Sequence, residues 1–189
     1  GWLPFHVICE QCGKLGTTKV YEWEGKLVSY RCEPKLVTWA TGCGYEGKVF
    51  PDTYYIRDDY GAKGIFDLML EDYNQRTAGL NLTEDDLILA SIVEREARND
   101  SERAAIAGLY KNRLKKNMKL EADPTVLYAN DSSLLSSGRF DSKTFEFWQP
   151  VAFSQYLKID SPYNTYLHSG LPPAPICNPG LKSIEAAIN

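Results

Sequence analysis

A long hydrophobic run is absent from this sequence. No stretch approaches the roughly 18 consecutive apolar residues that a membrane-spanning helix needs, although 43% of the 189 residues are hydrophobic. The opening residues, GWLPFHVICEQCGK, also lack the basic segment followed by an apolar one that marks a secretory signal. The sequence therefore predicts neither a transmembrane helix nor a signal peptide, and its apolar content suffices for a packed core.

An excess of positive charge is also absent. The chain carries 21 Lys and Arg against 25 Asp and Glu, a formal net charge of -4. Up to residue 49 the balance is 6 to 5, and in the remainder it is 15 to 20. This acidic balance argues against nonspecific nucleic-acid binding by the larger part, because such binding depends on clustered cations.

Cysteine is scarce beyond residue 43, where only Cys177 is found. The other four cysteines, Cys9, Cys12, Cys32 and Cys43, lie in the first 49 residues. This asymmetry predicts two modules, residues 1–46 and residues 47–189. In the first, CEQCGK is a Cys-x-x-Cys knuckle, and TKVYEWEGKLVSYRC has the pattern of a hairpin that returns to it. The four thiols predict a structural zinc site, while a disulfide pair or free thiols remain alternatives.

The stretch LTEDDLILASIVEREA has the pattern of an amphipathic helix in the second module. Thr83 followed three residues later by Asp86 resembles a capping box, which predicts that the helix begins there. Successive side chains rotate by about 100°. The apolar stripe then comprises Leu89, Ile92, Val93 and Ala97.

Two glutamates near the end of this helix differ in their predicted surroundings. Glu96 falls within the apolar stripe, whereas Glu94 points to the opposite side and is predicted to be a solvated charge. A carboxyl group in apolar surroundings has a raised pKa and can donate a proton near neutral pH. Glu96 is therefore a candidate general acid, and the alternative is that it pairs with Arg103 or another cation.

Two further segments carry candidate polar groups. DSERAAIAGLYKNRLKKN predicts a helix capped by Asp100 or Ser101, and Arg113 near its end either binds a carboxylate or sugar oxygen or forms a local salt bridge. Asp123 precedes Pro124, and its position favours a helix cap over a binding role.

The segment SPYNTYLHSGLPPAPICNPG is too rich in proline for a regular helix or a central strand. Its tyrosine, amide and hydroxyl groups suit an ordered loop with a polar ligand, since flat rings stack on sugar faces and amides match sugar hydroxyls. These groups belong to Tyr163, Asn164, Thr165 and Tyr166.

Residues 1–46 resemble the zinc-bearing segment of class I lysyl-tRNA synthetases. The resemblance is carried by CEQCGK, the hairpin pattern and GCGYEG, and it covers about a quarter of the chain. The signature motifs with which those enzymes hold ATP are absent. The resemblance therefore implies a zinc-binding module, and it does not imply aminoacylation.

The larger module resembles the endolytic murein transglycosylase family (YceG-like, MltG). The motifs EGKVFPDTYYI, LASIVEREA, ERAAIAGLYKNRLKKNMKLEADPTVLYA and SPYNTYLHSGLPPAPICNPGLKSIEAAIN occur in the family's order. The resemblance implies that Glu96 is catalytic, the same residue that periodicity indicates. It also implies that the following residues line the substrate cleft: Asn112, Arg113, Asp123, Thr125, Tyr163, Asn164, Thr165 and Tyr166.

By this resemblance, Glu96 protonates the glycosidic oxygen between N-acetylmuramic acid and N-acetylglucosamine. The muramyl 6-hydroxyl then attacks, giving a 1,6-anhydromuramyl end without any cofactor. Glycan strands of peptidoglycan, and the cell-wall synthesis machinery, are the implied partners. The implied location is the cell envelope, at the outer face of the cytoplasmic membrane, while the lack of a signal or anchor leaves a cytoplasmic location open.

The expected fold class is α+β. A small zinc-ribbon-like β module (1–46) is followed by a mainly helical α+β catalytic domain (47–189). The join at the shared Glu-Gly of GCGYEGKVF predicts a chimera, and the end at SIEAAIN predicts a C-terminally shortened domain. The alternative function is a zinc-binding, synthetase-like module with an inactive or glycan-binding-only C-terminal part.

Overall fold

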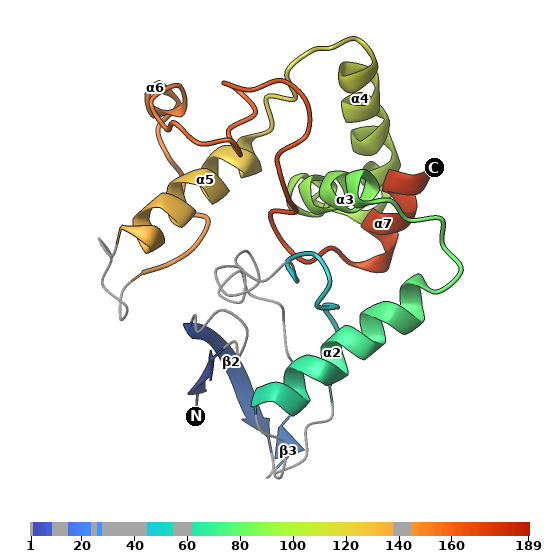
Figure 1. Ribbon diagram of the computed structural model, residues 1–189, viewed down its shortest axis with the longest axis vertical. Coiled ribbons are helices and arrows are strands. Elements are labelled where there is room, and N and C mark those ends of the chain that lie inside the picture. Colours follow the sequence, from blue (N-terminus) through green and yellow to red (C-terminus); the bar gives the residue numbers. More distant parts are fainter. Residues whose placement is uncertain (1, 9–14, 24–25, 28–44, 55–61, 138–144) are drawn as a thin grey trace. The chain divides into compact units, whose positions relative to one another are not determined.

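Figure 1 shows a computed structural model of the chain, which describes residues 2–8, 15–23, 26–27, 45–54, 62–137 and 145–189. The chain divides into two compact units. The first comprises Gly1–Leu80 with Asn178–Leu181, and the second comprises Asn81–Cys177 with Lys182–Asn189. The domain boundary predicted near residue 46 lies inside the first unit and stays a prediction. Within the described ranges, none of the helices has both the length and the apolarity that crossing a membrane demands.

The first unit contains three short strands near its N-terminus. β1 (Trp2–Ile8) pairs antiparallel with β2 (Leu15–Trp23), so that Ile8 lies opposite Leu15. β2 in turn pairs antiparallel with β3 (Lys26–Leu27). The last pairing falls in the segment predicted to form a hairpin, and it agrees with that prediction as far as residue 27.

Helix α2 (Ala62–Thr77) is the long helix of the first unit. Its side chains at Ile65, Met69 and Tyr73 are buried, and Leu68 is half-buried. These positions recur every three or four residues and therefore share one face of the helix. The apolar spacing of this stretch is therefore that of an amphipathic helix.

An amide side chain organises the segment that precedes α2 in the first unit. Oδ1 of the buried Asn178 accepts hydrogen bonds from the backbone N–H groups of Gly47, at 2.9 Å, and Val49, at 3.1 Å. The hydroxyl of Tyr54 donates to the carbonyl of Phe50 at 2.8 Å. These bonds satisfy backbone groups in an irregular segment, where no helix or strand would pair them.

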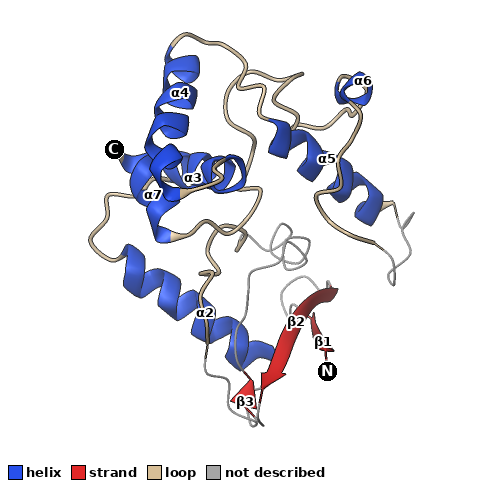
Figure 2. Cartoon of the chain, turned by 180° about the vertical axis from the view of Figure 1, so that it is seen from behind, coloured by secondary structure: helices blue, strands red, loops and turns tan. Residues whose placement is uncertain are grey.

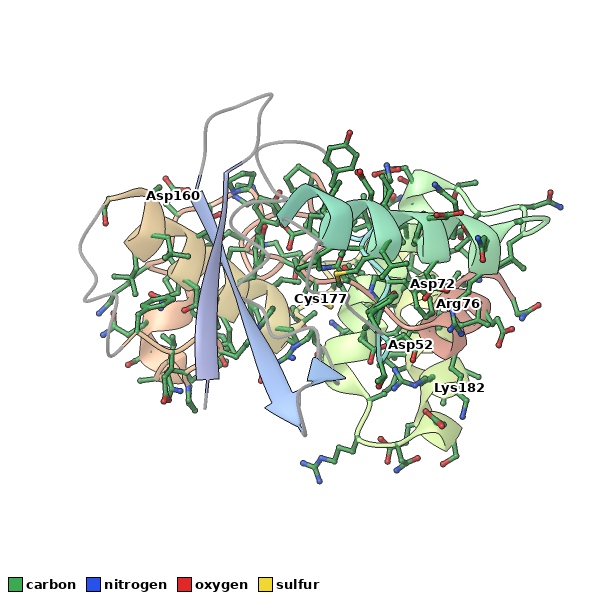
Figure 3. All side chains as sticks on the ribbon, turned by 90° about the horizontal axis from the view of Figure 1, so that it is seen from below. Asp52, Asp72, Arg76, Asp160, Cys177 and Lys182 are labelled. Carbon is green, nitrogen blue, oxygen red and sulfur yellow. The ribbon has the colours of Figure 1, made fainter. Side chains whose placement is uncertain are left out.

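Charged side chains gather at the end of α2. Figure 3 shows Asp52, Asp72 and Arg76 together. Nε of Arg76 lies 2.9 Å from Oδ1 of Asp72, and the same guanidinium also pairs with Asp52. Because these groups are partly exposed to water, each pair contributes only about 0–1 kcal/mol to stability.

Within the described residues of the second unit, every regular element is a helix, and loops and turns join the helices (Figure 2). Its elements are α3 (Glu84–Glu96), η2 (Asp100–Glu102), α4 (Arg103–Lys115), α5 (Asp123–Ser136), α6 (Phe153–Tyr156) and most of α7 (Leu181–Ile188). The expectation of an α+β catalytic domain is therefore met only in its helical part. The long proline-rich segment between α6 and α7 forms turns and irregular backbone, because proline cannot extend a helix or a central strand.

Helix α3 begins as predicted. Oγ1 of Thr83 accepts from the backbone N–H of Asp86 at 3.1 Å, and the Asp86 carboxylate accepts from the backbone N–H of Thr83 at 3.1 Å. The capping box is thus complete. It satisfies donors at the helix start that have no partner inside the helix.

The prediction that α3 is buried along one stripe is wrong, since all seven residues from Leu87 to Val93 are buried. Ser91, on the side left to solvent by the periodicity, donates its hydroxyl proton to the carbonyl of Ile88 at 2.7 Å. Its oxygen also accepts from the backbone N–H of Ile176 at 3.0 Å. The loop before α7 therefore covers the face of α3 that the sequence pattern predicts to be exposed to solvent.

The caps predicted for α4 are also wrong. The helix begins at Arg103, after the short turn η2, and it has no side-chain cap. Asp100 accepts from Nε of Arg103 at 3.1 Å and pairs with Lys182, while Ser101 donates to Asn99. The carboxylate is thus used by two cations rather than by backbone donors. Leu109, a large apolar residue of this helix, is 53% exposed.

The capping box makes a testable contribution to stability. We expect Thr83→Ala to lower the free energy of unfolding by about 1 kcal/mol, because the backbone N–H of Asp86 loses its acceptor. Thr83→Ser keeps that acceptor and should stay close to the parent. Urea denaturation followed by circular dichroism measures both variants, and an equal loss in the two would contradict this assignment of the cap.

Candidate active site

Glu96 lies at the C-terminal end of α3, and its side chain is half-buried. Its Oε1 accepts a hydrogen bond from the hydroxyl of Tyr110 at 2.8 Å. Tyr110 projects from α4 and is only 6% exposed. Because a buried tyrosine hydroxyl needs a partner, this contact fixes the carboxyl relative to both helices.

Three influences set the pKa of Glu96. Burial raises it, because the charged carboxylate loses hydration. The hydrogen bond from Tyr110 opposes that rise, since it favours the charged form, and the negative charge of Asp123 raises the pKa further. The net direction is upward, so the group keeps its proton to a higher pH than an ordinary glutamate does. This is the property that a general acid requires.

Asp123 is the first residue of α5, and the prediction that it caps this helix is wrong. The cap position is Ala122, and no side chain caps the helix. Instead, Oδ1 of Asp123 accepts from the hydroxyl of Tyr166 at 2.7 Å. Burial, and then the charge of Asp123, raise the pKa of Tyr156. A tyrosine from the later part of the chain therefore holds a carboxylate that influences Glu96.

Thr125 and Thr165 join α5 to the tyrosine-rich loop. Their hydroxyl oxygens are 2.8 Å apart, and both residues are almost completely buried. The Thr165 oxygen also accepts from the backbone N–H of Ala122 at 3.0 Å. Burial keeps these two predicted cleft residues away from a ligand, so any part they have in binding acts through the loop that they hold.

Asn164 is fully buried and organises the same loop from within. Its side-chain N–H groups donate to the carbonyls of Tyr156, at 2.7 Å, and Ile159, at 2.9 Å. Its Oδ1 accepts from the backbone N–H of Tyr166 at 3.0 Å. The amide therefore sets the position of Tyr166 beside Asp123, which is a positioning role.

The remaining predicted cleft residues are Tyr163, Arg113 and Asn112. Tyr163 is half-buried, with its ring centroid 4.7 Å from that of Tyr128. Arg113 forms the local salt bridge that the sequence left open as the alternative to a binding role. It lies 2.9 Å from Glu121 and also donates to two backbone carbonyls. Asn112 is exposed on α4.

Glu94 is not the solvated charge that the helix pattern predicts. Its Oε2 accepts from Nη1 of Arg103 at 3.0 Å and from the hydroxyl of Ser183 at 2.7 Å. Arg103 therefore pairs with Glu94, and the alternative in which it pairs with Glu96 is wrong. The physical reason is that α4 and α7 pack on this side of α3 (Figure 1), so both polar groups need partners there.

Sequence reasoning missed Tyr110, Tyr156 and Phe153 as members of the site. Helical spacing could have predicted Tyr110, because it lies on the apolar side of α4 and a buried hydroxyl there must find an acceptor. Helical spacing could not have predicted Tyr156 and Phe153, because they contact Tyr166 across the loop rather than along a helix.

The predicted zinc ligands Cys9, Cys12, Cys32 and Cys43 lie outside the described residues. In the described ranges, no group of His, Cys, Asp and Glu side chains is arranged to hold a metal ion. The zinc site therefore stays a prediction, which metal analysis of the purified protein would test.

The described part of the chain thus brings together a glutamate with a raised pKa, a second carboxylate that influences it, and the rings that contact Tyr166. The chain belongs to the YceG-like family, whose sequence profile matches residues 11–189.

Several known proteins resemble this chain. It is 37% identical over 153 residues to an endolytic murein transglycosylase of Bacillus subtilis, covering 76% of this chain and 38% of that protein. It is 34% identical over 152 residues to the endolytic murein transglycosylase of Streptococcus pneumoniae, covering 76% and 26%. The chain therefore spans well under half the length of these relatives.

A solved structure and a second kind of relative complete the comparison. The crystal structure of a YceG-like protein from Listeria monocytogenes matches with a TM-score of 0.59 and 34% identity, covering 76% of this chain and 45% of that one. A lysine–tRNA ligase of Methanosphaera stadtmanae is 40% identical over 48 residues, which is 25% of this chain and 7% of that enzyme. Both resemblances noted in the sequence are thereby confirmed.

Two matched substitutions should move the pKa of Glu96 in opposite directions. Tyr110→Phe removes a hydrogen bond to the charged form, so we expect the pKa to rise; Asp123→Asn removes a nearby negative charge, so we expect it to fall. Carbon-13 NMR titration of the carboxyl groups, with the Glu96 signal assigned by its loss in Glu96→Gln, measures both shifts. Shifts in the same direction would contradict the proposed balance of forces.

Proposed function

We propose that this chain carries the catalytic site of a peptidoglycan lytic transglycosylase that cuts within glycan strands, with Glu96 as the general acid and base. The observation that carries this proposal is the half-buried carboxyl of Glu96, with a raised pKa and a fixed hydrogen bond to Tyr110. Membership of the YceG-like family, and the names of the related enzymes, supply the substrate class.

In the first step, protonated Glu96 donates its proton to the oxygen that links N-acetylmuramic acid to N-acetylglucosamine. The bond from the muramyl C1 to this oxygen breaks, and the N-acetylglucosamine side leaves as an alcohol. Positive charge develops at C1 and the ring oxygen, as in other glycosidic cleavages. Glu96 is left as a carboxylate, which burial makes a stronger base than an exposed glutamate.

In the second step, the muramyl 6-hydroxyl attacks C1 of the same sugar. Glu96 accepts the proton of this hydroxyl and returns to its starting state, while a new C1–O6 bond closes the 1,6-anhydro ring. The attack is intramolecular, so it avoids the entropy cost of positioning a water molecule. One carboxyl can therefore serve both steps.

Asp123 supplies negative charge near the reacting centre. The Tyr166 hydroxyl donates a hydrogen bond to it, which leaves it poorly arranged to take a proton from water. A carboxylate held in this way is better suited to stabilise the developing positive charge. A hydrolytic reaction, with Asp123 activating water, is the runner-up mechanism, because a glycosidase of the ordinary kind uses two carboxyl groups.

Three rings form a cluster beside Asp123 that we call the aromatic shelf: Phe153, Tyr156 and Tyr166. Phe153 is exposed, Tyr166 is half-buried and Tyr156 is buried. The Tyr156 and Tyr166 centroids are 5.1 Å apart, and the Phe153 centroid lies 5.2 Å and 6.1 Å from them respectively. Phe153 is 73% exposed, which is unusual for so large an apolar side chain. We propose that a sugar of the glycan strand stacks on this shelf.

A glycan-binding protein without catalysis is the second candidate, since the exposed shelf alone would suit that role. The short match to a lysine–tRNA ligase favours a further possibility, a zinc-binding module attached to an inert C-terminal part. For the transglycosylase, the proposed place of action is the cell wall outside the cytoplasmic membrane, and the proposed partners are glycan strands and the machinery that synthesises them.

Purified peptidoglycan distinguishes these candidates. We expect the parent chain to release fragments with 1,6-anhydromuramyl ends, detected by mass spectrometry, and Glu96→Gln to release them at least 100-fold more slowly, at the low end of the roughly 10²–10⁴-fold contribution of a general acid. The matched control is Glu94→Gln, which changes the neighbouring carboxyl in the same way. If Glu94→Gln abolished cleavage while Glu96→Gln preserved it, the catalytic assignment would be wrong. Binding without cleavage by the parent would favour the glycan-binding candidate.

The aromatic shelf is tested by Phe153→Ala. We expect the KM for soluble glycan strands to rise roughly 2–10-fold, because a stacking contact is worth about 0.5–1.5 kcal/mol, with little change in kcat. Leu157→Ala removes another strongly exposed apolar side chain, 66% exposed, and serves as the control. Equal KM values for the parent and Phe153→Ala would remove the shelf from the binding site.

A further inference from the structure

Arg95 immediately precedes Glu96 in α3 and lies on the surface. Its guanidinium carbon sits 4.0 Å from the centroid of the Trp148 ring, a cation–π contact. Within the described part of the chain, Arg95 forms no salt bridge, whereas Arg103 and Arg113 each pair with a glutamate. The N–H donors of Arg95 are therefore left for water or for a ligand.

Trp148 is held beneath Arg95 at a cost to folding. Its φ of 64° lies in the left-handed region, which a residue with a bulky side chain seldom adopts. Its Nε1–H is buried and has no acceptor among the described residues. Unfavourable features of this kind persist where the surrounding structure enforces them, and they gather at binding and catalytic sites.

A buried carboxyl group enforces this conformation. Oδ2 of Asp131, which is 3% exposed, accepts from the backbone N–H of Trp148 at 2.8 Å. The ring of Tyr128 lies next to the indole, with centroids 6.3 Å apart. Asp131 and Tyr128 both belong to α5, so the indole is fixed to the helix that also carries Asp123.

The Arg95–Trp148 pair therefore lies further along α5 than the point where Tyr166 of the aromatic shelf contacts it. Asp131 follows Asp123 by eight residues, which is about 12 Å along the axis of α5. Tyr128, between them, contacts Tyr163 of the loop that also carries Tyr166, with ring centroids 4.7 Å apart. A chain-like ligand on the shelf would extend towards the guanidinium along this helix.

We propose that Arg95, held on Trp148, binds a carboxylate of the peptides that branch from the glycan strand. This inference rests on the proposed function. A guanidinium presents a planar pair of donors that matches a carboxylate, and stacking on the indole fixes its plane before the ligand arrives. The aromatic shelf then binds a sugar of the strand, while Arg95 binds a carboxylate of the peptide that the strand carries.

The test compares two forms of one ligand. Soluble glycan strands that keep their peptides are divided in two, and the free carboxyl groups of one portion are converted to amides, which removes charge while nearly preserving size. Binding is measured with Glu96→Gln, which cannot cleave the strands. We expect the native strands to bind roughly 3–10-fold more tightly than the amidated ones, as a partly exposed, charge-assisted contact would give.

Adding Arg95→Gln to that variant should bring the ratio of the two dissociation constants close to one. Adding Arg98→Gln instead removes an exposed cation from the same segment, and it should keep the parent ratio. The inference is overturned if the native strands bind no more tightly, if neither form binds, or if the preference persists after Arg95→Gln. The proposed function is judged separately, by whether the parent chain forms anhydromuramyl ends.

Discussion

The hydrogen bond between Tyr110 and Glu96 opposes the effect of burial on the Glu96 carboxyl. Burial at the end of α3 raises the pKa of Glu96. The Tyr110 hydroxyl stabilises the charged form and limits that rise. In the proposed mechanism, the raised pKa would keep a proton available for donation and would make the carboxylate a stronger base for the second step. Tyr110 would stabilise the carboxylate between the two steps.

The position of Tyr166 beside Asp123 depends on buried side chains. Asn164, Thr165 and Thr125 are buried, and their hydrogen bonds hold the proline-rich loop against the start of α5. Through them Tyr166 reaches Asp123, and Asp123 influences Glu96. An irregular loop can therefore hold a precise arrangement of groups, because its backbone donors and acceptors are satisfied by side chains rather than by helix or strand partners.

Local patterns in the sequence predicted features that depend on local physics. The capping box of Thr83 and the position of Glu96 near the end of α3 both follow from spacing within one helix, and the structure has both. The partners of Glu94 did not follow, because Arg103 and Ser183 are 9 and 89 residues away and are brought together only by packing. The hydrogen-bond partner of Asp123 did not follow for the same reason, since Tyr166 lies 43 residues later. The periodicity argument also assumes that one face of the helix is exposed to solvent. From Leu87 to Val93, α3 has no such face, because every residue is buried.

In the proposed mechanism, Glu96 serves both steps while the sugar's own hydroxyl attacks. This is tested by cleavage of peptidoglycan in water labelled with oxygen-18, read by mass spectrometry of the new muramyl ends. We expect anhydro ends that carry no label, since no water enters the product. Reducing ends that each carry one labelled oxygen would contradict it and would establish hydrolysis.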